Sequence, residues 1–174
     1  MKRLFYALML AALASSAWAD ASVKINVKWL YKDFTSPVSI YEMKGKPALW
    51  QMKSVPSLAD APVKKLMEGS SFRVLPGQSK RFVLIVKNPT DQPLYFFATP
   101  HMVHPEDDAL GFKFKCLCIN HSYTIGPKEI WYRVVEFRLN KDFVDGELTL
   151  THTILGIDKK RAASFPNEPV NPDM

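Results

Sequence analysis

The sequence predicts an all-β protein, an antiparallel β-sandwich built as a single domain. Short apolar stretches separated by turn signals recur along the second half of the 174-residue chain, a pattern typical of such sandwiches. The 13 prolines outnumber the 7 glycines, which suits short strands better than long helices. Strands do not alternate with helices along the chain, so a parallel sheet is not expected.

Residues 1–19 have the features of a cleaved secretory signal. Lys2 and Arg3 give a basic start, an apolar run follows, and Ala17-Trp18-Ala19 fits the pattern that signal peptidase reads. The apolar run is too short to cross a bilayer comfortably, and no later stretch reaches the length of a span. We therefore expect an exported, periplasmic protein with no membrane span after cleavage. An uncleaved anchor is the alternative.

The first half of the expected sandwich domain, residues 20–158, has weak signals after its first strand. Residues 23–29 alternate apolar with polar side chains, which indicates a half-buried strand. Residues 48–50 form a possible short strand. An acidic cap, a proline just inside the start and a glycine past the end predict one short helix over residues 61–67. The irregular stretch before Phe72 is expected to wrap around the sandwich.

Strand signals are stronger in the second half. Each apolar or alternating stretch is bounded by a turn signal such as Pro76-Gly77, Ile125-Gly126-Pro127 or Asp145-Gly146. Strands are expected over residues 72–75, 82–86, 94–98, 112–118, 130–139 and 148–154. The tail, residues 159–174, is rich in proline and poor in apolar groups, so we expect it to be loose.

Charge and motifs exclude several classes of function. The formal net charge is +6, and cleavage of the signal would remove two of the 23 basic residues and none of the 17 acidic ones, leaving +4. The basic residues are scattered and form no stripe with stacking aromatic residues, so nucleic-acid binding is not expected. No nucleophile elbow, zinc-protease motif, phosphate loop or dinucleotide fingerprint occurs, and we do not expect an enzyme.

The two cysteines are Cys116 and Cys118, at the end of an expected strand. Residues two apart on a strand point to the same side, so the thiols are expected to lie about 7 Å apart at the backbone. Thiolates this close suit a soft ion such as Cu(I), whereas a disulfide across one residue falls outside relaxed geometry. Buried, inert thiols and thiol-redox chemistry remain the alternatives.

Histidines lie on both sides of the cysteines in sequence. His101, Met102 and His104 precede them and His121 follows them, and imidazole, thioether and thiolate together are typical copper ligands. We therefore take these four residues as further candidate ligands, after the two cysteines. His152 falls on the apolar face of its strand and is interpreted as a core histidine.

Residues 71–157 carry several local patterns found together in one known family. Pro76-Gly77 precedes an apolar strand, Asn88 and Thr90 lie in the next turn, and residues 113–119 read Lys-Phe-Lys-Cys-Leu-Cys-Ile. In these features the chain resembles the cytochrome c oxidase assembly protein CtaG family of copper-delivery factors, although that family is membrane-anchored. The resemblance implies an immunoglobulin-like β-sandwich, Cu(I) binding by Cys116 and Cys118, and dimers that bring two thiol pairs together.

Taken together, these patterns predict a periplasmic copper-binding protein. It would act as a copper chaperone or store, without catalytic turnover, for a client cuproenzyme such as a cytochrome oxidase, and copper would promote a homodimer. Two alternatives remain open: an interaction module with buried thiols and no metal, and a periplasmic thiol-redox protein.

Overall fold

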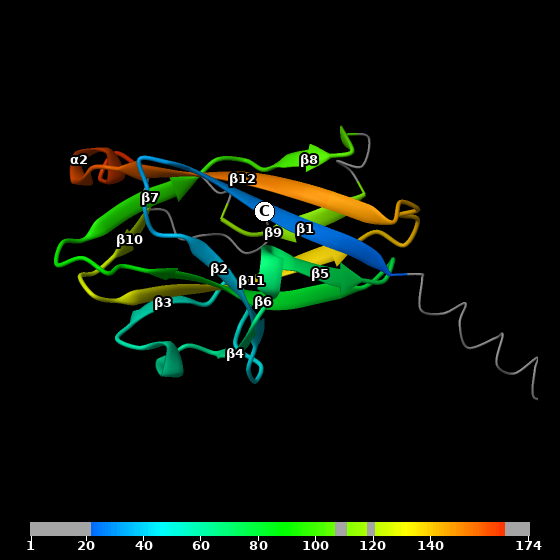
Figure 1. The fold of residues 1–174 in the computed structure, drawn as a ribbon, viewed down its shortest axis with the longest axis horizontal. Coiled ribbons are helices and arrows are strands. Elements are labelled where there is room, and N and C mark those ends of the chain that lie inside the picture. The colour runs from blue at the N-terminus through cyan, green and yellow to red at the C-terminus, as the bar shows by residue number, and fades with distance from the viewer. Residues whose placement is uncertain (1–21, 107–110, 118–120, 166–174) are drawn as a thin grey trace, which may run out of the picture.

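The computed structural model describes residues 22–106, 111–117 and 121–165, which fold into two facing β-sheets (Figure 1). The predicted all-β sandwich is confirmed. The expected signal, Cys118 and the last nine residues of the tail lie outside the described residues. No helix in the described part of the chain has the length and apolar character required to span a bilayer.

One sheet contains the first and the last strand of the chain. Its strands follow the order β10-β7-β12-β1-β5, and β8 also pairs with β12. Their bounds are β1 Val23–Lys32, β5 Ser71–Val74, β7 Leu94–Ala98, β8 Met102–His104, β10 Tyr123–Ile125 and β12 Glu147–Ile157.

The second sheet is centred on two long strands, β6 and β11. Its order is β3-β11-β6-β2-β4, and β9 also pairs with β11. The bounds are β2 Val38–Met43, β3 Met52–Val55, β4 Val63–Leu66, β6 Ser79–Lys87, β9 Phe112–Lys115 and β11 Ile130–Leu139.

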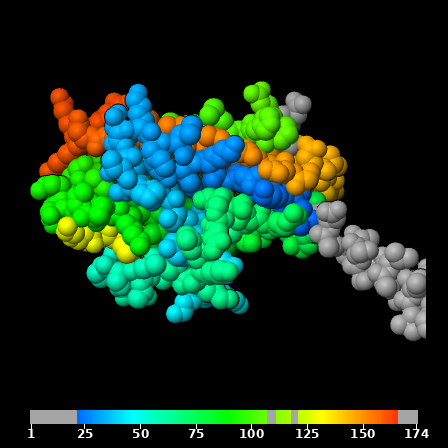
Figure 2. Space-filling model, in the orientation of Figure 1, coloured from blue at the N-terminus to red at the C-terminus, as the bar shows by residue number. Residues whose placement is uncertain are grey.

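The strands β1 and β12 pair in parallel, from Lys24 opposite Glu147 to Lys32 opposite Leu155. They lie side by side along one face of the molecule, blue against orange (Figure 2). This is the one departure from the expected antiparallel arrangement among the described strand pairs. The alternating pattern of both strands buries the same faces in either direction, so sequence periodicity does not distinguish the two pairings.

The predicted helix over residues 61–67 is wrong. Residues 63–66 form β4, between two 3₁₀ turns at Leu58–Asp60 and Glu68–Ser70. β4 forms the edge of the second sheet and hydrogen-bonds to β2, and this tertiary pairing overrides a capping signal that supports less than two helical turns. Residues 49–50 form a turn rather than a strand, and the strand starts at Met52.

The chain that links β3 to β4 packs on the outer face of the second sheet, where Leu58 and Ala61 lie in one cluster with Val83 and Ile85. This explains why β6 is buried on both faces from Phe82 to Val86. Phe82, Leu84 and Val86 join the main core between the sheets, whereas Val83 and Ile85 pack outward in a smaller cluster with Val55 and Ala61. The stretch before Phe72, expected to be irregular and to wrap around the sandwich, instead contributes β2, β3 and β4 to this sheet.

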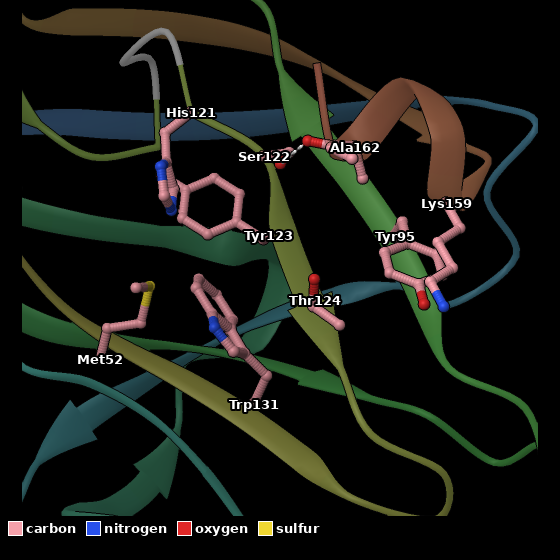
Figure 3. A pocket seen from close by; sticks show the side chains of 10 residues that line it. Met52, Tyr95, His121, Ser122, Tyr123, Thr124, Trp131, Lys159 and Ala162 are labelled. Carbon is pink, nitrogen blue, oxygen red and sulfur yellow. Dashed lines mark hydrogen bonds between the residues drawn. The ribbon is translucent and has the colours of Figure 1, made fainter. Parts of the chain in front are cut away.

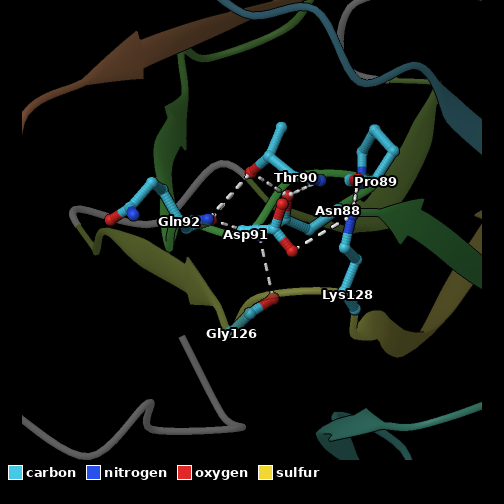
Figure 4. Close-up of polar contacts among 7 residues, drawn as sticks. All are labelled: Asn88, Pro89, Thr90, Asp91, Gln92, Gly126 and Lys128. Atoms are coloured by element: carbon cyan, nitrogen blue, oxygen red, sulfur yellow. Dashed lines mark hydrogen bonds and ion pairs between the residues drawn. The ribbon is translucent and has the colours of Figure 1, made fainter.

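A buried asparagine ties two turns together at one end of the sandwich (Figure 4). Asn88 is 2% exposed, and its side-chain amide donates to the carbonyls of Gln92 and Gly126 at 2.8 and 2.9 Å. Its side-chain oxygen accepts from the backbone N–H and the hydroxyl of Thr90 at 2.9 and 2.7 Å. The turn after β6 is thereby fixed to the end of β10.

The described part of the tail begins with a helical turn rather than loose chain. This is α2, Lys159–Ala162, and the Asp158 carboxylate caps it by accepting the Arg161 N–H at 2.7 Å. The turn packs near β7, where Phe97 and Phe165 place their ring centroids 5.3 Å apart.

Candidate metal centre

Three side chains with metal-ligating atoms meet between the two sheets. One donor atom each from His101, Cys116 and His152 lies within 4.8 Å of the other two. His152 comes from β12 of one sheet, Cys116 follows β9 of the other, and His101 immediately precedes β8. Residues up to 51 positions apart in sequence therefore form one cluster.

His152 reaches the cluster because of its position on β12. It belongs to the inward-facing set with Leu148, Leu150 and Ile154, and like them it is 0% exposed. The expectation of a buried histidine is correct, but the sequence analysis did not count it among the ligands. The signal available was the histidine itself, because a polar ring on an apolar strand face requires a polar partner.

The register of β8 separates His101 from its neighbours. Val103 pairs with Leu150 and packs against the core, so residues of the same parity, including His101, face inward. Met102 and His104 have the opposite parity, and both are exposed, Met102 by 60%. The structure thus brings His101 into the cluster and leaves Met102 and His104 on the outer face.

Cys116 continues the inward face of β9. Phe112 and Phe114 pair with Leu139 and Phe137 of β11 and pack toward the core. The strand ends at Lys115, after which Cys116 and Leu117 are both buried, at 3% and 0% exposure. The strand therefore stops before Cys116, and the expected alternation is already lost at Leu117.

Aromatic rings enclose the two imidazoles. The indole of Trp29 stacks on His152 with ring centroids 5.1 Å apart and planes inclined by 25°. Phe114 meets His152 edge-on at 5.5 Å, and Phe112 lies 5.5 Å from the ring of His101. His101 is the one partly exposed member of the cluster. A bound ion would be screened from water except on the His101 side.

The donor spacing fits a single metal ion. The Cys116 Sγ lies 3.9 Å from the His152 Nε2. Metal–sulfur and metal–nitrogen bonds of about 2.3 and 2.0 Å at an angle near 120° place two such donors roughly 3.7 Å apart. Only small side-chain movements would be required for coordination. A set of two imidazoles and one thiolate suits copper, and zinc requires one further ligand.

His121 lies apart from this cluster, in a pocket beside β10 (Figure 3). Its ring meets Tyr123 edge-on with centroids 5.2 Å apart. Burial and, secondarily, the positive charge of Arg133 lower the pKa of His121 below its usual value, so its imidazole is neutral at pH 7. The structure therefore does not bring His121 to the cluster of His101, Cys116 and His152. Cys118, the other expected thiolate, lies outside the described residues.

Comparison with known proteins gives a family but no function. The chain belongs to the family described as Domain of unknown function (DUF8709), whose model matches residues 23–157. That range runs from the first residue of β1 to the last residue of β12 and includes all three cluster residues. No curated protein matches the chain.

Proposed function

We propose that this protein is an exported copper-binding protein that holds Cu(I) between His101, Cys116 and His152. The observation that carries the proposal is the convergence of these three donors within 4.8 Å between the sheets. The cluster lies in an aromatic surrounding, where an electrostatic bond between a thiolate and a cation is stronger than in water.

The donor chemistry favours copper over the other common metal ions. A soft thiolate with two imidazoles binds copper well, whereas magnesium and calcium require oxygen ligands. Cu(I) accepts three ligands, so one chain supplies enough of them. Cys118 is the candidate for an auxiliary thiolate through which the ion passes to or from the cluster.

The burial of the site supports a role in holding the ion rather than in catalysis. Cys116 and His152 are 3% and 0% exposed, so a substrate has no direct access to the ion from their sides. Exchange would take place past His101, toward a client protein in the periplasm. This agrees with a carrier or a store, and the resemblance to the CtaG family supports the same chemistry. The homodimer stays a prediction, which light scattering on apo and copper-loaded protein tests.

One-electron transfer is a second candidate function. The observation that favours it is the donor set, because two histidines and one cysteine form the equatorial ligands of blue-copper sites. Protein loaded with Cu(II) would then show an intense visible thiolate-to-copper band that reductant abolishes reversibly. A carrier or store would instead retain Cu(I) without such a band.

The deciding experiment is copper loading of the reduced protein, followed by desalting, metal analysis and competition with a chromophoric Cu(I) chelator. We expect one copper per chain, with tight binding lost in Cys116→Ser and retained in His121→Gln. An interaction module would bind no copper and keep its thiols protected from titration. A thiol-redox protein would form a reversible disulfide and keep no copper after desalting. Either of these results would contradict the proposal.

A further inference from the structure

Two buried hydrogen bonds in series connect the interior of the sandwich to the backbone next to Cys116. The hydroxyl of Tyr123 donates to the backbone carbonyl of Leu117 at 3.1 Å. The guanidinium of Arg133 donates to the oxygen of the same hydroxyl at 2.6 Å. Because Leu117 directly follows Cys116, these bonds end one residue away from the thiol of the metal cluster.

The backbone at this point lies beyond the reach of strand pairing. The pairing of β9 with β11 ends at Lys115, opposite Glu136, and Cys116 and Leu117 follow it. Both residues are buried, at 3% and 0% exposure, and in such surroundings a hydrogen bond is stronger than in water. The Tyr123 hydroxyl therefore holds the chain just after the strand has ended.

The ring of Tyr123 is itself held in a fixed position. Tyr123 is the first residue of β10 and is 1% exposed. Its ring stacks on Phe96 with centroids 5.0 Å apart and planes inclined by 28°, and it meets Trp131 at 63° with centroids 5.1 Å apart. Figure 3 shows this ring beside His121 and Trp131. Packing of the ring therefore fixes the place of its hydroxyl.

Arg133 reaches the same hydroxyl from the other sheet. It faces inward from β11, with the parity of Trp131, and is 1% exposed. Its guanidinium carbon lies 4.5 Å from the ring centroid of Trp50. A hydrogen bond from a charged donor is stronger than one from a neutral donor, and it polarises the hydroxyl that accepts it. The bond from Tyr123 to Leu117 is strengthened as a result.

We propose that Tyr123 and Arg133 are positioning residues of the metal cluster. Through the Leu117 carbonyl they hold the Cys116 Sγ near the His152 Nε2, at the 3.9 Å separation that suits one ion. They act on the thiol through the backbone and are not ligands. This inference rests on the proposed copper-binding function, because a fixed thiol has this purpose only where an ion is bound.

A matched pair of buried tyrosines tests the inference. Tyr123→Phe keeps the ring and removes the hydroxyl that reaches Leu117. Tyr132→Phe makes the same change in a residue that is 3% exposed, whose hydroxyl accepts from the Gln51 side chain at 2.9 Å and whose ring belongs to the outer cluster. By chelator competition, Cu(I) affinity should fall about 10-fold in Tyr123→Phe, as for one buried hydrogen bond, and stay unchanged in Tyr132→Phe. At full loading, the thiolate-to-Cu(I) ultraviolet absorption per copper should decrease only in Tyr123→Phe.

A second measurement follows the thiol without copper. In the Cys118→Ser background, iodoacetamide should alkylate Cys116 of the folded apo protein about 10-fold faster in Tyr123→Phe, because the backbone beside the thiol opens more easily. Tyr132→Phe should react at the rate of its parent. A parent protein that binds no copper would contradict the proposed function and the copper role of the two residues, whereas the alkylation rates would still decide whether Tyr123 anchors Cys116.

The part of Arg133 is tested with Arg133→Met, which replaces the buried cation by an apolar side chain. If Arg133 acts through Tyr123, alkylation should be faster in Arg133→Met than in its parent, and the double variant with Tyr123→Phe should react no faster than Tyr123→Phe alone. Additive effects would overturn the role of Arg133. Parent-like affinity and alkylation rate in Tyr123→Phe, or equal changes in the two tyrosine variants, would overturn the whole inference.

Discussion

The metal cluster and the β10 pocket both place a histidine among aromatic rings, yet their neighbours differ. His152 stacks on Trp29 and faces the thiol of Cys116 at 3.9 Å. His121 meets Tyr123 edge-on and lies near the positive charge of Arg133. The cluster joins donors that bind a soft cation, whereas the histidine of the pocket lies near a positive charge.

This difference shows that residue type alone does not identify a ligand. His121 is near the cysteines in sequence, but it precedes β10 and lies near the positive charge of Arg133. A distant histidine, His152, is placed at the thiol by the register of β12. The predictions below test how the two regions differ in metal binding and in their contribution to stability, beginning with the largest expected effect.

The thiolate at the cluster should dominate copper binding. We expect Cys116→Ser to weaken Cu(I) affinity by more than about 100-fold, because a hydroxyl does not replace a soft anionic ligand. Chelator competition measures the change. Cys118→Ser is the matched control and should lose much less affinity. An equal loss in both variants would favour the paired-thiolate site suggested by the CtaG resemblance over the cluster of two histidines and Cys116.

The two turns joined by Asn88 should determine the stability of the pocket end. Asn88→Ala removes a buried side chain that bonds to Thr90, Gln92 and Gly126, and leaves their polar groups without that partner. The expected loss is about 2 kcal/mol in the free energy of unfolding, measured by urea denaturation. Copper affinity of the folded variant should not change, since Asn88 lies at the β10 end. A stability equal to that of the wild type would contradict the role assigned to this residue.

The histidines of the two regions should respond differently to the same substitution. We expect His101→Gln to reduce Cu(I) affinity by about 10-fold, because two donors remain to hold the ion. His121→Gln should leave the affinity unchanged, since its ring belongs to the pocket. Chelator competition at a single pH measures both. A larger loss in His121→Gln than in His101→Gln would mean that the chain after Cys116 turns back to bring His121 to the metal.

The strands could be predicted where the local pattern was strong enough to determine them. The expected strand over residues 130–139 has the same bounds as β11, because a long run of β-branched and aromatic residues strongly favours a strand. The helix predicted over residues 61–67 is wrong because β4 forms only through its pairing with β2. Such pairing leaves no signal in the local sequence. The parallel pairing of β1 and β12 likewise depends on contacts between the two ends of the chain.

The candidate site was half predictable for the same reason. The two-residue spacing of the cysteines pointed to Cys116, and the ligand chemistry pointed to His101. The assignment of His152 to the core was correct for its burial, but its proximity to Cys116 depends on sheet packing across 36 residues. His121 illustrates the converse, because closeness in sequence to Cys116 did not produce closeness to the cluster.

The smallest expected effect is the pH dependence of stability at His121. Burial and Arg133 lower the pKa of this imidazole in the folded protein, whereas the unfolded chain keeps the ordinary value near 6.5. The unfolded state therefore binds more protons as pH falls below 6.5, and folding stability decreases until the folded-state pKa is passed. Because His121 is partly exposed, we expect this contribution to be no more than about 0.5 kcal/mol. Urea denaturation of wild type and His121→Gln between pH 7.5 and 5 measures this contribution, because the method resolves differences in unfolding free energy on the order of a few tenths of a kcal/mol. The variant should show the shallower decline, and parallel pH profiles would mean that His121 protonates equally well in the folded and unfolded states.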